Sequence, residues 1–341
     1  MRFKSILVSI TEKCHVGCAH CGFIGSVRER EPEPKDMASW VGQACDYGVP
    51  VIIFTGGEPF ERLDCLIEGV GTAEMAKTPA AVFTSSFWAK TPEATRDTLR
   101  SLPGLKHLYL SSDTYHQRRV PYQNVFNVIE TAFSLSIPTI TICITYSNEE
   151  ECAEVRRQYA GYGNRLRFST ERVIPNPFFS KKVLAHQAAL LGPRPSEFRC
   201  HCEIGTPIVN PNGDVFSCHI GKAAAHRDLR ELPYFLGNLY EGSFEEIMNR
   251  AAARPAYQFL RTYGPRGVAG LYEKNPDLIK AVGRDGFTNE CDMCFSTLST
   301  PEGRAALERH VSQTEVQDGI DMRLALAHRE DPLPTRVGNN S

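Results

Sequence analysis

The chain has 341 residues, with 38 lysines and arginines against 40 aspartates and glutamates and a net charge of −2. At about 150 residues per domain, this length predicts roughly two domains. A nearly neutral chain lacks the basic surface needed for wholesale binding to nucleic acid or to anionic membranes. A hydrophobic content of 42% excludes a disordered chain.

The N-terminal segment has only a short apolar run, Ile6 to Ile10, which is too short for the core of a signal peptide. No stretch of the sequence approaches the roughly 18 apolar residues of a membrane span. We therefore expect a cytoplasmic protein. In a reducing cytosol, the 12 cysteines are expected to form metal or catalytic sites and not disulfides.

Short β-rich segments alternate with helical patterns from Ser5 to Thr170. The predicted strands are Ser5–Thr11, Val51–Thr55, Ala81–Ser86, His107–Asp113, Thr139–Thr145 and Arg165–Thr170. The helices predicted between them include Lys35–Tyr47, Pro92–Ser101, Tyr122–Ser136 and Glu149–Tyr162. This α/β alternation is typical of a parallel sheet.

The later strands alternate polar and apolar side chains, which indicates whether the sheet is open or curved. In Thr139–Thr145, three threonines and Cys143 share one face while isoleucines occupy the other, because strand side chains alternate. A sheet with helices on both faces would have nearly continuous apolar strands. The alternation therefore predicts an incomplete barrel with outer helices and a polar interior.

The composition changes after about residue 190, where Pro, Gly and Cys lie close together and Asn210 to Asp214 has the sequence of a hairpin turn. We expect a barrel domain over residues 1–190, a small cysteine-rich domain of a β-hairpin plus helices over 191–300, and a C-terminal helix and tail over 301–341. The helices predicted in this half are Ser243–Ala252 and Pro301–His310.

Three cysteines lie on one short loop directly after the first strand. Cys14, Cys18 and Cys21 have the spacing C-x3-C-x2-C, so their thiolates are able to hold three corners of a metal assembly. A structural zinc site would need a fourth ligand, which His15 or His20 would supply. A [4Fe-4S] cluster held by three cysteines instead leaves one iron open to bind a substrate or cofactor.

This loop resembles the signature of the radical S-adenosylmethionine (radical SAM) superfamily, where the same spacing follows the first strand of a partial (β/α)6 TIM-like barrel. The family usually has an aromatic residue before the third cysteine, where this chain has His20. The resemblance implies that Cys14, Cys18 and Cys21 hold a [4Fe-4S] cluster. It also implies that S-adenosylmethionine (SAM) chelates the unique iron.

A second motif, TGGEP, occupies residues 55–59 at the end of the second predicted strand. By itself it is a strand-ending turn, but after the cysteine loop it resembles the GGEP motif of the same family. The resemblance implies that Gly56, Gly57, Glu58 and Pro59 bind SAM, with Glu58 at the methionine amino group. We expect the glycines to be needed because the ligand lies against the main chain.

Polar residues near the ends of the later strands are further candidates for contact with SAM or substrate. His116 and Glu171 lie just beyond strand ends, where active sites gather. The alternative is that such residues satisfy backbone groups of the loops. The residues predicted to bind the ribose and carboxylate of SAM are Ser86, Ser111, Asp113 and Arg167.

A second group of cysteines lies in the C-terminal half. Cys202 and Cys218 flank the predicted hairpin, and Cys291 and Cys294 form a C-x2-C pair. Four thiolates in this arrangement make a closed site for zinc or for a [4Fe-4S] cluster. Cys200 competes with Cys202 as a ligand.

This half resembles the radical SAM "twitch" domain, a shortened SPASM domain. The similarity comes from C-x2-G at Cys202 to Gly205, the NGDVFSC hairpin, LGNL at Leu236 to Leu239 and the final C-x2-C. Full SPASM domains have further cysteines and hold two auxiliary clusters, whereas no cysteine follows Cys294. The resemblance implies one auxiliary [4Fe-4S] cluster on Cys202, Cys218, Cys291 and Cys294.

The implied reaction begins with electron transfer from a flavodoxin- or ferredoxin-type donor and cleavage of SAM to a 5′-deoxyadenosyl radical, which takes hydrogen from an unactivated C–H bond. Oxidation follows if the auxiliary cluster accepts an electron, and epimerisation follows if a thiol returns hydrogen. Cys143 is the candidate thiol because it faces the predicted polar interior, and Cys200 is the other. Cys143 is alternatively an inert core residue.

Two substrate classes remain for such an enzyme. Peptide-modifying members of the family that this chain resembles often carry an N-terminal leader-recognition domain. Only 13 residues precede Cys14, so we expect no such domain, and this favours a small molecule such as an aminocyclitol, sugar or nucleoside in natural-product biosynthesis. Epimerisation or crosslinking of a ribosomally made peptide is the alternative. The competing class is a zinc-binding module without enzymatic activity, which would not explain GGEP.

Overall fold

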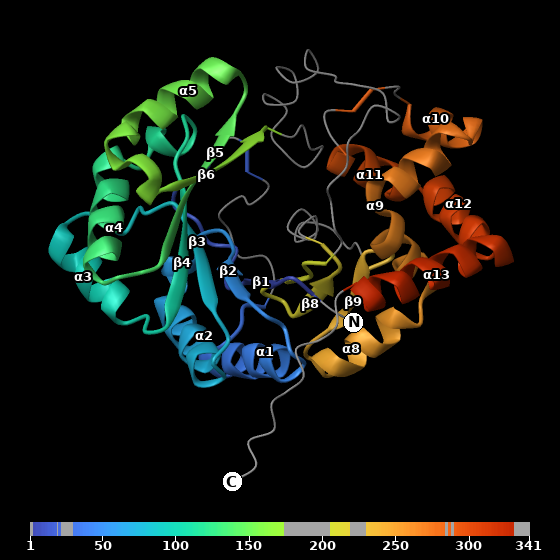
Figure 1. The fold of residues 1–341 in the computed structure, drawn as a ribbon, viewed down its shortest axis with the longest axis horizontal. Coiled ribbons are helices and arrows are strands. Elements are labelled where there is room, and N and C mark those ends of the chain that lie inside the picture. Colours follow the sequence, from blue (N-terminus) through green and yellow to red (C-terminus); the bar gives the residue numbers. More distant parts are fainter. Residues whose placement is uncertain are drawn as a thin grey trace, which may run out of the picture.

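The computed structural model describes residues 3–18, 20–21, 30–173, 205–218, 230–283, 286–287 and 290–330. Strands and helices alternate through its first half, and helices α1 to α5 lie along the outer side of a curved sheet (Figure 1). The strands are β1 (Ile6–Ser9), β2 (Ile52–Thr55), β3 (Ala80–Thr84), β4 (Leu105–Ser111), β5 (Thr139–Tyr146) and β6 (Arg167–Arg172). The helices are α1 (Pro34–Asp46), α2 (Leu63–Met75), α3 (Pro92–Arg100), α4 (Tyr122–Ser134) and α5 (Glu149–Gln158).

All six predicted strands are present, and neighbouring strands from β1 to β6 pair in parallel. Each predicted helix of this half is also present, with shifted ends. The helix predicted over Glu149–Tyr162 ends at Gln158, and a 3-10 helix, Ala160–Arg165, follows it. The α/β fold predicted from the alternation is confirmed.

The two faces of the sheet differ as predicted from the alternation. On β4 and β5, Leu108, Leu110 and Ile142 are fully buried against the outer helices, whereas Tyr109 and Cys143 on the inner face are only half-buried. Burial of the apolar face is the main favourable term for such a layer. The inner face therefore forms the polar interior that the alternation predicted.

The strands of the cysteine-rich half continue the same sheet. The order is β6-β5-β4-β3-β2-β1-β7-β8-β9, where β7 is Ile208–Val209, β8 is Asp214–Phe216 and β9 is Phe235–Asn238. β7 pairs in parallel with β1, and β7 and β8 form the predicted hairpin. The turn needs Gly213, whose φ of 84° is in the left-handed region. The division of the chain near residue 190 stays a prediction.

Helices fill the rest of the C-terminal half, with α9 to α13 on the opposite side of the molecule from α3 and α4 (Figure 1). The two predicted helices are present, and α8 begins with a capping box of Ser243 and Glu246. The part of the chain that the structure describes has no helix long and apolar enough to cross a membrane. The helices are α8 (Phe244–Ala252), α9 (Pro255–Glu273), α10 (Pro276–Val282), α11 (Glu290–Leu298), α12 (Pro301–Val311) and α13 (Thr314–Glu330).

Candidate functional site

The first cysteine loop lies after β1, at the edge of the sheet where the parallel strands end. Cys14, Cys18 and Cys21 are half-buried, and the charges of Cys14 and Cys21 both act on Cys18. Burial raises the pKa of Cys14 to about 11 and raises that of Cys18 still further. Burial thus opposes ionisation of Cys14 and Cys18, and the positive charge of a metal cluster favours their thiolate forms.

The GGEP turn packs directly against the start of this loop. The amide of Gly57 donates to Thr11 O at 2.7 Å, and that of Glu58 donates to Lys13 O at 2.8 Å. A Cβ on Gly56 would lie 2.6 Å from Thr11 O, and one on Gly57 would lie 2.3 Å from Lys13 O. The glycines are therefore required by the chain's own backbone. That SAM also lies against them stays a prediction.

Glu58 is enclosed by the same turn and is only 1% exposed. Its Oε1 accepts from Thr84 Oγ1 at 2.8 Å and from Phe60 N at 3.4 Å, and its Oε2 accepts from Ser85 N at 2.8 Å and Ser85 Oγ at 2.5 Å. Burial raises the pKa of Glu58, while these hydrogen bonds oppose the rise. Because a carboxylate has about four acceptor sites, Glu58 here joins the end of β2 to the end of β3. Its contact with SAM stays a prediction.

Charged side chains support the outer side of the loop. Glu31 accepts a hydrogen bond from Thr11 and pairs with Lys13 at 3.4 Å and with Arg62 at 3.6 Å. His15 contacts Glu61. Glu31 had no signal in the sequence, because its partners Thr11, Lys13 and Arg62 are 18 or more residues away. Glu31 thus connects the cysteine loop to the start of α2.

Asp113 lies just after β4 and is 1% exposed. It accepts hydrogen bonds from the amides of Tyr115 and His116 at 3.0 Å, and His116 Nδ1 donates to it at 2.9 Å. Burial opposes ionisation of Asp113, but the hydrogen bond and charge of His116 outweigh burial and lower its pKa. Asp113 therefore remains a carboxylate and orients the His116 ring.

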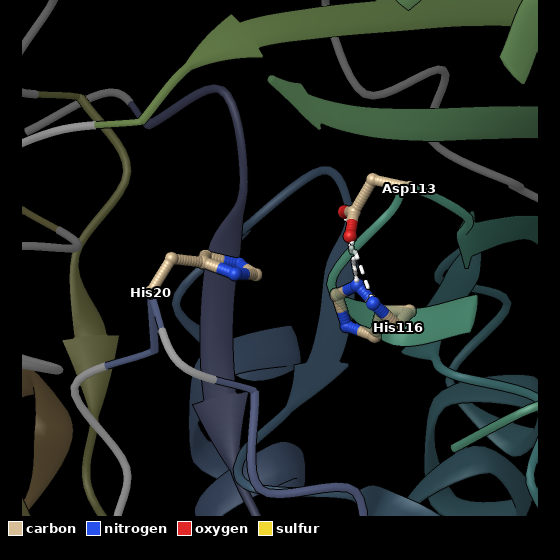
Figure 2. A group of neighbouring side chains, drawn as sticks. All are labelled: His20, Asp113 and His116. Atoms are coloured by element: carbon tan, nitrogen blue, oxygen red, sulfur yellow. Dashed lines mark hydrogen bonds and ion pairs between the residues drawn. The ribbon is translucent and has the colours of Figure 1, made fainter. Parts of the chain in front are cut away.

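His20 completes a group with these two residues, and Figure 2 shows its ring directed from the cysteine loop toward Asp113 and His116, which lie together after β4. Ligand atoms of His20, Asp113 and His116 all lie within 4.8 Å of one another, a donor set that suits a divalent transition metal. Burial lowers the pKa of His20 to about 4, and its Nδ1 is buried with no hydrogen-bond partner in the described residues. The sequence predicted Asp113 and His116 singly, but did not place His20 beside them.

Ser86 follows β3 in a strained backbone conformation. Its φ is 66°, a value that costs a non-glycine residue free energy and occurs often at functional sites. The side chain is fully buried, and its Oγ has no hydrogen-bond partner in the described part of the chain. Buried polar atoms that lack partners, such as Ser86 Oγ and His20 Nδ1, fit a polar ligand at this end of the barrel.

Strand register arranges the interior in layers. One layer contains Tyr109, Thr141 and Arg167, and the next contains Ser111, Cys143 and Ser169. Cys143 and Ser111 are therefore neighbours in the interior, as predicted from the alternation. Which of them contacts SAM or substrate stays a prediction.

Aromatic rings stack on one another in the interior, next to the layer that contains Cys143. The ring of Phe83 lies 4.2 Å from that of Tyr109, which lies 3.9 Å from that of His107, and His107 Nε2 bonds Thr141 Oγ1 at 2.8 Å. Burial, and then the charge of Arg167, lower the pKa of His107 to about 4. This stack was not predicted from the sequence, because its rings come from two neighbouring strands, β3 and β4.

The second group of cysteines converges around Tyr234, which directly precedes β9. Cys291 and Cys294 are three residues apart on α11, so they share one face of the helix. The charges of Cys294, Cys218 and Cys291 all act on Tyr234. Cys200 and Cys202 lie outside the described residues. The structure thus brings together three of the four predicted auxiliary ligands, and Tyr234 had no signal in the sequence.

A cavity of about 640 Å³ lies elsewhere, between α9, α12 and α13. Its lining includes Tyr263, Arg266 and His310 but none of the predicted site residues. The candidate site is therefore the end of the barrel, where the cysteine loop, Glu58 and Asp113 meet.

Two family models match the chain. Residues 8–158 match the Radical SAM superfamily. The chain therefore contains a radical SAM domain. Residues 200–269 match SPASM, described as an iron–sulfur cluster-binding domain. These domains imply that the enzyme binds SAM and iron–sulfur clusters, and the three neighbouring thiols on the first loop fit a cluster with one open iron.

The chain is similar to proteins whose names indicate different chemistries. It is 25% identical over 197 residues to the GTP 3′,8-cyclase of Listeria monocytogenes, covering 53% of this chain and 55% of the cyclase, so the chain spans about half the length of that relative. It is 18% identical over 303 residues to the putative peptide biosynthesis protein YydG of Bacillus subtilis, covering 88% of this chain and 93% of YydG. A similar solved structure is Streptococcus suis SuiB bound to the precursor peptide SuiA. It is 13% identical, the match covers 80% of this chain and 73% of SuiB, and the TM-score is 0.46.

Proposed function

We propose that the enzyme holds two [4Fe-4S] clusters and inverts a carbon centre in a ribosomally made peptide. In this proposal Cys14, Cys18 and Cys21 hold the SAM-binding cluster. The auxiliary cluster has as ligands Cys202, Cys218, Cys291 and Cys294. When bound, SAM and its cluster supply a 5′-deoxyadenosyl radical that removes one hydrogen atom from an unactivated C–H bond.

The position of Cys143 carries this proposal. Its thiol is half-buried and lies in the interior layer between Ser111 and Ser169. The neighbouring layer contains Tyr109, which belongs to the aromatic stack. A thiol S–H bond is weak, so Cys143 returns a hydrogen atom to the face of the substrate opposite the one that lost it. The sulfur radical that remains takes an electron from a flavodoxin- or ferredoxin-type donor and a proton from solvent.

Other interior residues hold the reactants. Asp113, fixed by His116, and Ser86 are placed at strand ends to bind the polar groups of SAM. Arg167 is exposed on β6, in the same layer as Tyr109, and is placed to bind a substrate carboxylate or carbonyl. The match to YydG over nearly the whole of both chains supports a peptide substrate.

Dehydrogenation of a small molecule, such as an aminocyclitol, sugar or nucleoside, is the second candidate. It is favoured by the convergence of Cys218, Cys291 and Cys294 around Tyr234, because an auxiliary cluster is able to accept the electron that such an oxidation releases. The match to a GTP 3′,8-cyclase also supports a small-molecule substrate. In this case Cys143 only lines the barrel interior and does not donate a hydrogen atom.

The two candidate reactions differ in the number of hydrogen atoms in the product: epimerisation leaves this number unchanged, and dehydrogenation lowers it by two. The reduced enzyme is incubated with SAM in deuterium oxide and with two probe pools, one of synthetic peptides and one of aminocyclitols, sugars and nucleosides. Epimerisation adds one deuterium to a peptide, because the Cys143 thiol exchanges with solvent. Loss of two hydrogens from a small molecule instead supports the second candidate.

The variant Cys143→Ala tests the role of the thiol. We expect it to cleave SAM but to add no deuterium to the product. Cys45→Ala is the matched control, because Cys45 is also a half-buried free thiol but lies on α1 outside the barrel, and it should behave as the wild type. Deuterium gain in Cys143→Ala would reject Cys143 as the donor and leave Cys200 as the remaining candidate.

A further inference from the structure

The hydroxyl of Tyr234 lies against one of the predicted auxiliary ligands. Tyr234 Oη is 2.9 Å from Cys294 Sγ and donates to Cys294 O at 3.1 Å. The tyrosine is 1% exposed, so water does not compete for this hydroxyl. The contact joins segments 60 residues apart in the sequence.

The backbone of Tyr234 fixes the other side of the same site. Its carbonyl accepts a hydrogen bond from Ser217 N at 2.8 Å, and Ser217 directly precedes Cys218. Tyr234 thereby connects the hairpin that carries Cys218 to helix α11, which carries Cys291 and Cys294. Tyr234 is thus held by its backbone carbonyl on one side and by its hydroxyl at Cys294 on the other.

We propose that Tyr234 donates a hydrogen bond to the Cys294 thiolate of the auxiliary cluster and raises the reduction potential of that cluster. The inference rests on the auxiliary cluster of the proposed function. A cluster-bound thiolate has no proton, so Sγ only accepts, and donation to a charged acceptor is stronger than donation to the Cys294 carbonyl. Reduction adds negative charge to the sulfurs and strengthens the bond, so the bond favours the reduced state.

This role makes Tyr234 a positioning residue that acts through Cys294. A higher potential makes the auxiliary cluster a better electron acceptor and a poorer donor. Tyr234 would therefore influence whether a substrate radical is oxidised or receives a hydrogen atom. Hydrogen bonding to ligand sulfur is one of the ways in which a protein sets a cluster potential.

The test is a redox titration of the holoenzyme, followed by electron paramagnetic resonance, in the wild type and in Tyr234→Phe. We expect the auxiliary cluster of the variant to have a lower midpoint potential, with its ratio of reduced to oxidised forms falling about tenfold at a fixed potential, or about 59 mV for one electron. The cluster on Cys14, Cys18 and Cys21 is the internal reference and should not shift.

Tyr257→Phe is the matched control. Tyr257 is fully buried, and the charge of Cys218 acts on it, but its hydroxyl has no hydrogen-bond partner in the described residues. Removing this hydroxyl should leave the auxiliary potential unchanged. Equal shifts in both variants, or no shift in Tyr234→Phe, would overturn the role of Tyr234.

A second substitution keeps the test decisive if Tyr234→Phe fails to assemble the cluster. Replacing Tyr234 by 3-fluorotyrosine preserves its shape and makes the hydroxyl a stronger donor, so the potential should rise; an unchanged or lower value contradicts the proposal. Iron analysis separates the two levels of inference. About four irons in the wild type would reject the auxiliary cluster itself, whereas about eight irons without a potential shift would reject only Tyr234.

Discussion

The two groups of cysteines are assembled in opposite ways. Cys14, Cys18 and Cys21 come from one loop of eight positions that the GGEP turn supports through backbone hydrogen bonds. The described auxiliary ligands come instead from the end of β8 and from α11, and Tyr234 connects them. A local site is visible in the sequence as a spacing, whereas a site built from distant elements depends on packing. The two sites should therefore respond differently to substitution.

The largest expected effect separates the roles of the two groups. Cys14→Ala/Cys18→Ala/Cys21→Ala should abolish formation of 5′-deoxyadenosine, because no open iron remains to bind SAM, while Cys291→Ala/Cys294→Ala should retain it. Iron should fall from about eight to about four atoms per chain in either variant. Chromatographic detection of 5′-deoxyadenosine and iron analysis check this. Complete loss of SAM cleavage in the second variant would break the division of roles.

A second prediction concerns the support of the first site. Glu58→Gln should lower the free energy of unfolding by about 2–3 kcal/mol, because an amide NH2 then faces the buried donors of Thr84 and Ser85. Urea denaturation measures the change. Glu93→Gln on exposed α3 is the control and should alter stability by less than about 0.5 kcal/mol. A change of that small size in Glu58→Gln would show that the turn does not depend on the carboxylate.

A buried carboxylate, Asp214, also supports the β7–β8 hairpin, but it has fewer buried hydrogen-bond donors around it than Glu58 has. Asp214 is 7% exposed and accepts from Asn238 Nδ2 at 2.8 Å, with Arg230 at 3.0 Å. Asp214→Asn should cost about 1–2 kcal/mol, since fewer buried donors lose their acceptor. The same urea experiment compares it with Glu58→Gln. A larger loss at Asp214 would show that the hairpin, and not the GGEP turn, is the more dependent of the two.

A smaller effect is expected from His107, whose protonation makes the stability of the barrel depend on pH. His107 has a pKa of about 4 in the folded state, below about 6.5 in an unfolded chain. As the pH falls through this range, the unfolded chain takes up a proton first, so the folded state loses stability. His107→Gln should lose less stability than the wild type between about pH 7 and about pH 5 in urea denaturation. An identical loss would assign the pH dependence to other groups.

His310 is the corresponding histidine of the C-terminal half. Burial, and then the charge of Lys274, lower its pKa, so the sign of its effect is the same. His310 lines the cavity between α9, α12 and α13, where solvent screens charges more strongly than it does around His107. His310→Gln should therefore reduce the loss of stability on acidification by less than His107→Gln does.

Local patterns were sufficient for the barrel. The alternation in Thr139–Thr145 predicted the strand, its inner face and the interior position of Cys143, because a strand's two faces are set by neighbouring residues. Patterns of this kind were less useful for α9, α10, α11 and α13, which were not predicted. Helix α9 contains Gly264 and Pro265, and Gly264 departs from helical geometry, so its sequence contains two residues that usually end a helix.

Long-range contacts explain what the sequence did not reveal. Glu58 was predicted from a motif as a ligand of SAM, but its partners Thr84 and Ser85 lie 26 and 27 residues away. The glycines before it are required by the approach of Thr11 and Lys13. Neither contact is encoded by a spacing, because each depends on how β1, β2 and β3 are placed side by side.

The sequence by itself determined the parallel α/β barrel, the polar interior and the cysteine loop, because periodicity and loop spacing are properties of residues close together in the chain. Only the tertiary structure decided that His20 lies beside Asp113 and His116, and that Tyr234 lies against Cys294. These groups come from separate elements, and their separation is set by strand register and helix packing. No local interaction energy specifies such distances, which result from the burial of the whole core.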